Sequence, residues 1–437
     1  MEKDDLMEKI ISLSKRRGFV FQGSEIYGGL AGTWDYGPLG VLLKENVKQL
    51  WMKQFVHDRD DMFAVDAAIL MNPRVWEATG HVAGFSDPLV ECSKCKKRFR
   101  EDHLEDSKKC PSCGGEIGEA RQFNMMFKTQ IGATEDPDSI SYLRPETAQG
   151  IFVNFKNIVD TFHPKLPFGI AQIGKAFRNE IAPRDFIFRV RELEQMEVEY
   201  FVKEKNWEEK FEEWKDEMWE YIDTIGLPRE KVHELEVAPE DRAHYSKRTI
   251  DFEFDFPFGK KELYGLAYRT DHDLKSHQEL SKQKLDYMDE EAGEKIIPHV
   301  IEPSLGVDRT ILALLVSAYT EDEMNGETRA FLKFSPKVAP IKVAVFPLMK
   351  NKPELVTKAR EIFDSIRSEI PQITFDDNGN VGKRYRRQDE IGTPLCVTID
   401  FDTLEDDSVT LRDRDTGKQD RVKIGDLIAT IKLRLNK

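Results

Sequence analysis

The chain contains Phe177-Arg178-Asn179-Glu180 and, after a short gap, Phe186-Ile187-Phe188-Arg189-Val190-Arg191-Glu192-Leu193-Glu194-Gln195-Met196-Glu197-Val198-Glu199-Tyr200. Both segments mix aromatic and β-branched residues with charged ones, which predicts two strands, and Pro183 and Asp185 predict a loop between them. Because side chains alternate along a strand, one face of the second strand would carry Arg189, Arg191, Leu193, Gln195, Glu197 and Glu199. Such a polar face is costly to bury unless its side chains pair or bind a ligand. The alternative interpretation is an exposed antiparallel hairpin with cross-strand ion pairs, and the strand face alone favours neither.

Length and composition limit the classes of protein to consider. With 437 residues and 40% hydrophobic content, the chain can form roughly two to four domains with a sizeable core. The formal net charge of −15 argues against binding nucleic acid through bulk charge, so any RNA contact would be local. There is no run of about eighteen apolar residues, and residues 1–5 are too acidic for a targeting signal. We therefore expect a cytoplasmic protein without a membrane span.

Four of the five cysteines form two Cys-x-x-Cys pairs separated by 14 residues. The members are Cys92, Cys95, Cys110 and Cys113. Each pair can place two thiolates around one ion, and Gly114-Gly115 allows a tight turn behind the second pair. Two pairs at this spacing predict a structural zinc ribbon in a reducing compartment, because four thiolates close the site to substrate. The alternative is free structural cysteine.

Residues 177–200 resemble motif 2 of the class II aminoacyl-tRNA synthetases, and the string from Arg189 to Glu197 is similar in particular to the dimeric glycyl-tRNA synthetase family. Gly37-Pro38 before an amphipathic helix resembles motif 1 of that class. Residues 298–309, followed by an apolar helix over 310–319, resemble motif 3. The resemblance extends in chain order from Gly28 to about residue 430.

The helix expected after Gly37-Pro38 carries an apolar stripe of Val41, Leu42, Val47, Leu50, Trp51 and Phe55. On the residues alone, this stripe is more typical of plain core. The resemblance implies instead that the helix builds the interface of a homodimer.

The resemblance implies an α/β (α+β) fold in two domains. A class II catalytic domain, with an antiparallel sheet flanked by helices, would span residues 1–335, with a zinc-ribbon insert at 90–116 and a helical insertion at 203–250. A proline-bounded linker precedes residues 340–437, where strand and helix patterns alternate as in an α/β module. Its counterpart in the family is the anticodon-binding domain. The other expected elements are helices over 6–20 and 352–369 and strands over 252–256, 261–267 and 395–400.

The resemblance also implies a reaction. The protein would activate glycine with ATP to glycyl-adenylate and pyrophosphate, and transfer glycine to the 3′ end of tRNA(Gly). An ionised carboxylate needs no general base to attack the α-phosphorus, so catalysis would be positioning and charge stabilisation. The implied catalytic groups are Arg178 at the α-phosphate and the glycine carboxylate, Arg309 at the γ-phosphate, and Glu262 as the group that holds Mg²⁺. Burying Arg309 where a helix begins is expensive unless it meets an anion.

The resemblance further implies which residues hold ATP. They are Arg178, Asn179, Glu180, Phe188, Arg189, Val190, Arg191, Glu192, Leu193, Glu262, Leu263, Gly306, Val307, Asp308 and Arg309. Glu180 would accept a hydrogen bond from the adenine amino group. The family usually has a phenylalanine at the position of Leu193, and that ring stacks on adenine; leucine keeps an apolar contact but lacks the aromatic face. Either weaker ATP binding or stacking supplied only by Arg309 would follow.

The implied glycine-binding residues are Arg100, Glu146, Leu193, Glu194, Gln195, Met196, Glu197, Glu302, Pro303, Ser304, Leu305 and Gly306. Glycine offers no side chain, so recognition must come from its ammonium group. The carboxylates of Glu146, Glu197 and Glu302 would supply the negative field, with Gln195 and Ser304 as neutral partners, and larger amino acids would be excluded sterically. The lone His81 has no predicted role.

The C-terminal module contains a basic segment with one aromatic residue, namely Lys383, Arg384, Tyr385, Arg386 and Arg387. This composition suits phosphate contact and base stacking on tRNA. The alternative is a solvated helix face.

Two other functions compete with a glycyl-tRNA synthetase. One is another synthetase of the same subclass, for threonine, proline, serine or histidine, but Glu-Gln-Met-Glu at 194–197 and Glu-Pro-Ser at 302–304 favour glycine. The other is a non-catalytic accessory protein that binds nucleic acid. Such a protein should have lost the side chains that hold ATP. Arg178, Glu180, Glu262 and Arg309 are all present in this chain.

Overall fold

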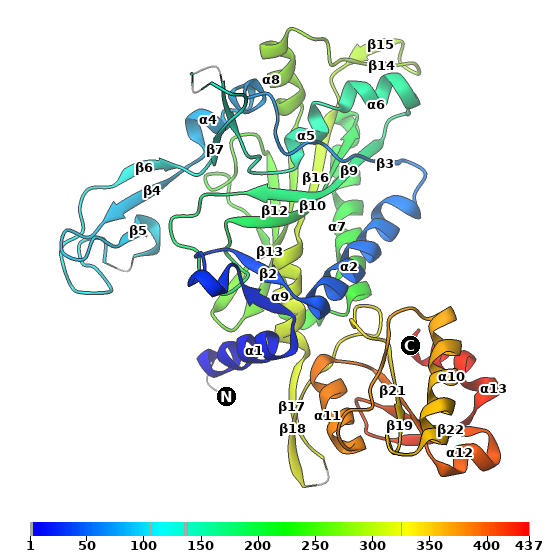
Figure 1. Cartoon of the computed structure of the whole chain (residues 1–437). Helices are drawn as coiled ribbons and strands as arrows, with labels where there is room; N and C mark the ends of the chain where they lie inside the picture. Colours follow the sequence, from blue (N-terminus) through cyan, green and yellow to red (C-terminus); the bar gives the residue numbers. More distant parts are fainter. Residues whose placement is uncertain (1–2, 105, 135, 137–138, 325, 437) are drawn as a thin grey trace.

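The computed structural model describes residues 3–104, 106–134, 136, 139–324 and 326–436 (Figure 1). Its centre is a seven-stranded sheet with the strand order β11-β12-β13-β16-β10-β9-β3. These strands are β3 (Met62–Ala64), β9 (Phe168–Phe177), β10 (Glu192–Val202), β11 (Val232–Glu236), β12 (Arg248–Phe256), β13 (Gly259–Thr270) and β16 (His299–Gly306). Neighbours pair antiparallel, except that β3 and β9 are parallel. The predicted antiparallel sheet flanked by helices is confirmed.

β10 is an internal strand that pairs with β9 on one side and with β16 on the other. Two of its acidic side chains are buried, because Glu197 is 2% exposed and Glu199 is 0% exposed. The alternative of an exposed hairpin is therefore wrong.

The predicted limits of the two strands around the first loop are also wrong. β9 ends at Phe177, so Arg178 and Glu180 lie beyond the strand, and β10 begins at Glu192 instead of Phe186. The reason is the backbone between them: Asp185 has φ 60° and Phe186 has φ 59°, a left-handed conformation that a strand does not contain. The aromatic residues of this segment turn into the main core instead of extending β10.

Helices cover the face of the sheet opposite to the acidic side chains. They are α2 (Pro38–Met52), α7 (Trp207–Ile225) and α9 (Val307–Ala318), which contact one another and the sheet (Figure 1). Met196 and Val198 of β10 face this side and belong to the main core. The aromatic stripe of α7, with Phe211 and Trp214, is buried in the same core as expected. Gly226, with φ 82°, ends α7 in a left-handed cap.

The stripe predicted for α2 is buried only in part. Val47 and Trp51 are fully buried, and so is Leu43, whereas Val41 is 46% exposed. The helix continues for one wider turn over Lys53–His57. An exposed apolar residue on α2 is left available for a contact outside the chain.

Shorter elements surround the central sheet. They are α1 (Lys3–Arg17), β1 (Val20–Gln22), β2 (Trp34–Tyr36), α3 (Arg74–Ala78), α4 (His81–Gly84), β4 (Ser86–Glu91), β5 (Arg98–Arg100), β6 (Arg121–Asn124), β7 (Lys128–Gln130), β8 (Ile140–Tyr142), α5 (Ala148–Phe152), α6 (Phe155–Phe162), α8 (His272–Ser281), β14 (Tyr287–Asp289) and β15 (Glu294–Ile296). The strands β5, β4 and β6 form a separate three-stranded sheet, which carries the cysteine pairs and extends away from the main body (Figure 1).

The C-terminal part is built on a five-stranded sheet with the order β20-β19-β21-β22-β23. Its elements are β19 (Val343–Pro347), α10 (Pro353–Glu369), β20 (Ile373–Phe375), α11 (Val381–Ile391), β21 (Leu395–Ile399), α12 (Phe401–Asp406), β22 (Ser408–Asp413), β23 (Gln419–Lys423) and α13 (Ile424–Leu435). β19 pairs parallel with β20 and β21, and β22 and β23 are antiparallel. The predicted α/β module is confirmed.

A hairpin of β17 (Tyr319–Met324) and β18 (Glu327–Leu332) runs beside α11 (Figure 1). Asp389 of α11 accepts from Arg329 of the hairpin at 3.1 Å, and from two nitrogens of Arg412 on β22 at 2.8 and 2.9 Å. These three side chains are at most 5% exposed. A buried carboxylate therefore ties the hairpin to the C-terminal sheet.

Replacing Asp389 by alanine should lower the free energy of unfolding by about 3–5 kcal/mol, because Arg412 would stay buried without a carboxylate. Chemical denaturation followed by circular dichroism measures this change. The control is Glu327→Ala, which removes a partner of Arg386 that is 76% exposed and should cost about 1 kcal/mol or less. Equal losses in the two variants would contradict the role given to Asp389.

Candidate active site

Two adjoining cavities lie on the acidic face of the sheet, around β10, β13 and β16. The larger has a volume of about 300 Å³ and the smaller one of about 240 Å³. Arg178, Gln195, Glu262 and Ser304 line both cavities, so two ligands could meet at this boundary. The other residues that line the larger cavity are Arg100, Met125, Glu180, Phe188, Arg189, Val190, Leu193, Glu194, Leu263, Gly306, Asp308 and Arg309.

Four arginines line the larger cavity, together with four carboxylates. Arg309 stands where α9 begins, and its Cζ lies 4.6 Å from the centre of the Phe188 ring. Its Nη1 donates to the Glu262 carbonyl at 2.9 Å and pairs with the Glu262 carboxylate at 3.1 Å. A hydrogen bond to the backbone fixes the Arg178 side chain, because its Nε donates to the Pro145 carbonyl at 3.0 Å. The charge of Arg309 lowers the pKa of Glu262, so that carboxylate is ionised.

Arg189, Glu180 and Asp308 also line the larger cavity. Arg189 Nη1 lies 3.4 Å from Glu180 Oε2, and Asp308 accepts the backbone N–H of Glu194 at 2.8 Å. Together with Arg100, Arg178 and Arg309, this gives four guanidinium groups around one space. Planar guanidinium groups match phosphate oxygens in geometry, so the cavity suits a polyphosphate.

Seven residues expected at a ligand line neither cavity. They are Asn179, Arg191, Glu192, Met196, Pro303, Leu305 and Val307. Met196, Leu305 and Val307 are fully buried in the main core, since they alternate with neighbours that face the cavities. The predicted side-chain contacts of these seven residues with a ligand therefore do not fit the structure.

Carboxylates dominate the smaller cavity, which is lined by Glu146, Glu197 and Glu302. Glu197 is held by four donors. Its Oε1 accepts from Gln195 Nε2 and from Ser304 Oγ, each at 2.8 Å. Its Oε2 accepts from the Thr147 N–H at 3.1 Å and from the Thr147 hydroxyl. Since every donor is fixed by β10, β16 or the turn before α5, the position of this carboxylate is fixed too.

One buried arginine balances part of the negative charge. Arg269, which is 1% exposed, donates to Glu302 Oε1 at 2.7 Å and makes two bonds of 2.8 Å to Asp273. Glu146 lies opposite, with its Oε2 at 3.3 Å from His81 Nε2. The acids outnumber the cations, so the smaller cavity suits a small cation.

Burial sets the protonation of these acids. Burial raises the pKa of Glu302 to about 8, and the neighbouring charge of Glu197 adds to this effect. Burial and Glu302 raise the pKa of Glu199 strongly, and neither carboxyl oxygen of Glu199 has a hydrogen-bond partner among the described residues. Although burial acts in the opposite sense, His81 lowers the pKa of Glu146. The smaller cavity therefore holds ionised acids together with acids that ionise near neutral pH.

Sequence reasoning missed several residues of the site. Arg269 and Tyr245 stack with 3.9 Å between Cζ and the ring centre. Asp251 lines the smaller cavity, and its burial and the charge of Glu262 raise its pKa to about 7. The charged Arg-x-x-x-Asp pattern at 269–273, which begins at the end of an apolar strand, could have indicated Arg269. His81 and Asp251 carry no local signal, because their partners come from distant segments.

Arg100 lies in the larger cavity and not in the smaller one. Its guanidinium pairs with Asp87 at 2.6 Å and with Asp102 at 2.7 Å. This placement does not fit the predicted contact with glycine and suits an anion in the larger cavity instead.

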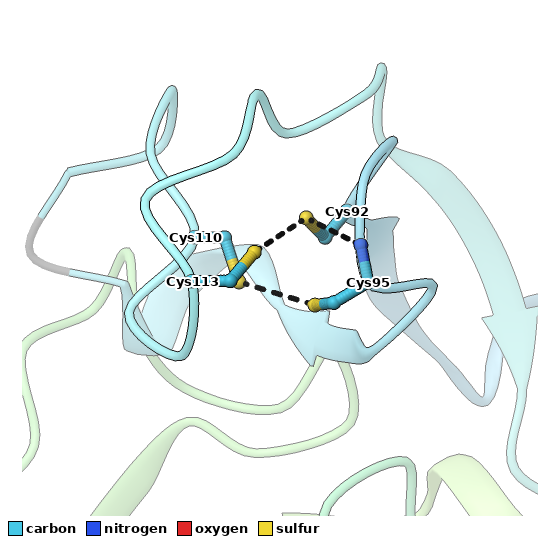
Figure 2. Close-up of side chains that lie close together, drawn as sticks. All are labelled: Cys92, Cys95, Cys110 and Cys113. Carbon is cyan, nitrogen blue, oxygen red and sulfur yellow. Dashed lines mark hydrogen bonds between the residues drawn. The ribbon is translucent and has the colours of Figure 1, made fainter.

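The four cysteines of the two Cys-x-x-Cys pairs converge in the outlying lobe (Figure 2). Their sulfur atoms all lie within 4.8 Å of one another, and the pairs Cys92–Cys113 and Cys95–Cys110 are each 3.6 Å apart. A tetrahedral Zn²⁺ site with bonds of about 2.3 Å would separate its sulfur atoms by about 3.8 Å. The Cys95 backbone N–H donates to the Cys92 sulfur at 3.5 Å and lowers the pKa of Cys92 to about 6. This cluster could hold a metal ion.

The five residues expected at tRNA lie on α11, at 383–387, but not all face solvent. Arg384 is 1% exposed and donates to the backbone carbonyls of residues 377 and 379. Tyr385 donates to or accepts from Thr398 at 2.5 Å. Arg386 and Arg387 are each paired with a carboxylate at 2.6 Å. The predicted phosphate contact does not fit Arg384, which is used inside the domain, and Lys383 is the exposed cation of the group.

Comparisons with known proteins agree with this arrangement. Residues 127–318 match the family described as tRNA synthetase class II core domain (G, H, P, S and T), and residues 342–434 match the anticodon binding domain. The glycine–tRNA ligase of Clostridium acetobutylicum is 52% identical over 98% of each chain. That of Treponema denticola is 51% identical over 98% of this chain and 96% of its own, and that of Caldanaerobacter subterraneus is 51% identical over 96% of each.

Identity at this level over nearly the whole length separates glycine from the other amino acids of the subclass, whose synthetases share the core domain. The chain belongs to the glycine–tRNA ligase family of class II aminoacyl-tRNA synthetases.

Proposed function

We propose that this protein is a glycine–tRNA ligase. It activates glycine with ATP to glycyl-adenylate and pyrophosphate, and transfers the glycyl group to the 3′ end of tRNA(Gly). The observation that carries the proposal is the junction of the two cavities, where a space lined by arginines meets a space lined by carboxylates. Triphosphate and ammonium would bind on opposite sides of this boundary, and the glycine carboxylate would lie between them.

In the proposed mechanism, the arginines act by position and charge. Arg178 lies at the boundary and would contact both the α-phosphate and the glycine carboxylate, which reduces the repulsion between them. Arg309, fixed by Glu262 and Phe188, would hold the end of the triphosphate. Glu180 would accept from the adenine amino group. Leu193 and Phe188 line the larger cavity and would provide its apolar contacts with the base.

Mg²⁺ is the cation expected with ATP. Glu262 and Asp251 fit such an ion, because the charge of Glu262 affects the Asp251 carboxyl, and oxygen ligands from one or two carboxylates suit Mg²⁺. When bound, the ion would neutralise charge on the phosphates. Zn²⁺ is the metal we propose for the four-cysteine cluster, where it would be structural.

The specificity for glycine rests on its ammonium group. Glu146, Glu197 and Glu302 would surround that group, and the fixed Glu197 would set its position. A side chain on the α-carbon would push the ligand away from these three contacts, which excludes larger amino acids.

The assembly and compartment are further parts of the proposal. We propose a homodimer, since apolar side chains are exposed both on α2 and between β1 and β2, namely Val41 at 46%, Ile26 at 89% and Tyr27 at 86%. We propose catalytic and anticodon-binding domains at 1–335 and 340–437, with the zinc-ribbon insert at 90–116 and the helical insertion at 203–250. The anticodon-binding domain would contact tRNA with Lys383 and neighbouring groups on α11.

A cytoplasmic location would suit the reduced thiols. Among the described residues, none of the helices is both long enough and apolar enough to cross a membrane.

Aminoacylation tests the function directly. Purified protein with ATP, Mg²⁺ and tRNA(Gly) should attach labelled glycine to the tRNA in an ATP-dependent reaction. Absence of glycine attachment by folded protein would contradict the proposal.

Replacing Arg309 by alanine should lower glycine-dependent ATP–pyrophosphate exchange by about 100- to 1,000-fold, since one preorganised charge at the phosphates would be lost. The control is Arg184→Ala, which removes an arginine outside both cavities and should change the rate by about twofold or less. Similar rates for Arg309→Ala and the unmodified protein would contradict the role of Arg309.

Replacing Glu302 by glutamine should weaken glycine binding more than ATP binding, as isothermal titration can measure. In the unmodified protein, Glu302 must lose its proton to pair with ammonium, and its pKa in the empty cavity is about 8. Glycine affinity should therefore fall as the pH is lowered from about 8 to 6, by up to about tenfold per unit. Glu302→Gln should flatten this dependence, whereas the exposed Glu234→Gln should preserve it. Equal losses for glycine and ATP would argue against this assignment.

The cluster should hold about one zinc per chain after dialysis, as measured by inductively coupled plasma mass spectrometry. Cys110→Ser should lose this metal because three thiolates remain. Cys396→Ser is the matched control, since Cys396 is buried outside the cluster and its loss should leave the zinc content unchanged. Retention of metal in Cys110→Ser would exclude the four-cysteine site.

A further inference from the structure

Behind the smaller cavity lies a chain of buried hydrogen bonds centred on Gln149. Its Nε2 donates to Glu146 Oε1 and to Asp273 Oδ1, each at 3.0 Å. Its Oε1 lies 2.8 Å from His277 Nε2. Gln149 is 0% exposed, Asp273 2% and His277 6%, so water does not readily replace any of these bonds.

The surroundings determine which way the amide of Gln149 points. The pKa of Glu146 and the pKa of Asp273 are both lowered, by His81 and Arg269 respectively, despite burial. Ionised carboxylates only accept hydrogen bonds, so the nitrogen of Gln149 must face them. Its oxygen then needs a donor on the other side, and the Nε2–H of His277 supplies it. Without that donor the oxygen would be buried and unpaired, which is unfavourable and would loosen the position of the amide between the two carboxylates.

His277 connects the glycine cavity to a different part of the molecule. It lies on α8 and lines a third cavity of about 290 Å³, whose wall also includes Val75, Val153 and Leu280. This cavity shares no residue with the larger or the smaller cavity of the site. A residue outside the site therefore touches a residue that holds one of its carboxylates.

We propose that His277 is a positioning residue for glycine recognition: it fixes the amide of Gln149, and Gln149 fixes the carboxylate of Glu146 at the ammonium group. The inference rests on the proposed function, because it assigns Glu146 to glycine. His277 does not touch the substrate and acts only through Gln149.

The effect should be specific for glycine. Glu146 lines the smaller cavity, and none of Gln149, Asp273 and His277 lines the larger one. From Asp273 the chain continues through Arg269 to Glu302, so both of its ends reach carboxylates of the smaller cavity. Loss of the His277 donor should therefore alter the contact with ammonium and leave the phosphate contacts intact.

His277→Leu removes the donor and keeps an apolar side chain at the third cavity. Glycine-dependent ATP–pyrophosphate exchange should show a KM for glycine raised about tenfold, with the KM for ATP changed by about twofold or less and kcat largely kept. His277→Gln is the matched conservative variant, because its side-chain amide nitrogen can take the place of the imidazole Nε2. It should restore the KM for glycine to within about threefold of the unmodified value.

Val75→Ala controls for a disturbed cavity wall and should leave the KM for glycine unchanged. If thermal denaturation shows that His277→Leu does not fold, Gln149→Met removes the same link from its other end and should raise the same constant. An unchanged KM for glycine in the folded donor-free variant would overturn the inference. So would equal increases in His277→Leu and His277→Gln, which would indicate a purely structural role. Failure of the unmodified protein to use glycine would be a different result and would refute the proposed function itself.

Discussion

The structure depends on the burial of several carboxylates around a single arginine at the centre of an antiparallel sheet. Arg269 supplies one positive charge to Glu302 and Asp273, while Glu197 is held by neutral donors. Buried charges of one sign are destabilising unless they are paired, protonated or matched by a ligand. In this protein the remaining negative charge lines a cavity, which suits the binding of a cation.

The sheet makes this arrangement possible because β10 separates two kinds of side chain. Met196 and Val198 face the helices and build the main core, whereas the alternate residues Gln195 and Glu197 face the cavities. The antiparallel register with β16 places Glu197 opposite Ser304. Stability and function therefore come from opposite faces of the same strand, and a slip of one residue in the register would exchange them.

The polar face of β10 and the cysteine cluster could be predicted from the sequence because each follows from a local pattern of residues. Alternation along residues 186–200 predicted the polar face of β10, and the spacing of the cysteines predicted the cluster that the structure brings together. The turn before β10 could not be predicted from the sequence. The left-handed backbone at Asp185 and Phe186 accompanies the burial of the aromatic residues of that segment in the main core. An alternating pattern of charged and apolar residues looks the same whether the backbone extends or turns.

The residues that sequence reasoning missed depend on contacts between distant segments. His81 of α4 approaches Glu146, which precedes α5, only through the tertiary fold, and Arg269 reaches Glu302 only through the register of β13 with β16. On α11, composition predicted RNA contact for all of residues 383–387, but Arg384 is buried and donates to backbone carbonyls. Composition gives the charge of a segment, whereas burial decides which charges remain available.

We propose that the smaller cavity, lined by carboxylates, selects glycine for reaction with ATP bound in the larger cavity, which is lined by four arginines. ATP–pyrophosphate exchange measured with each of the twenty amino acids tests it most directly. Exchange is expected with glycine, and little exchange is expected with alanine or serine, because their side chains would disturb the ammonium contacts. Equal exchange with alanine, or none with glycine, would contradict it.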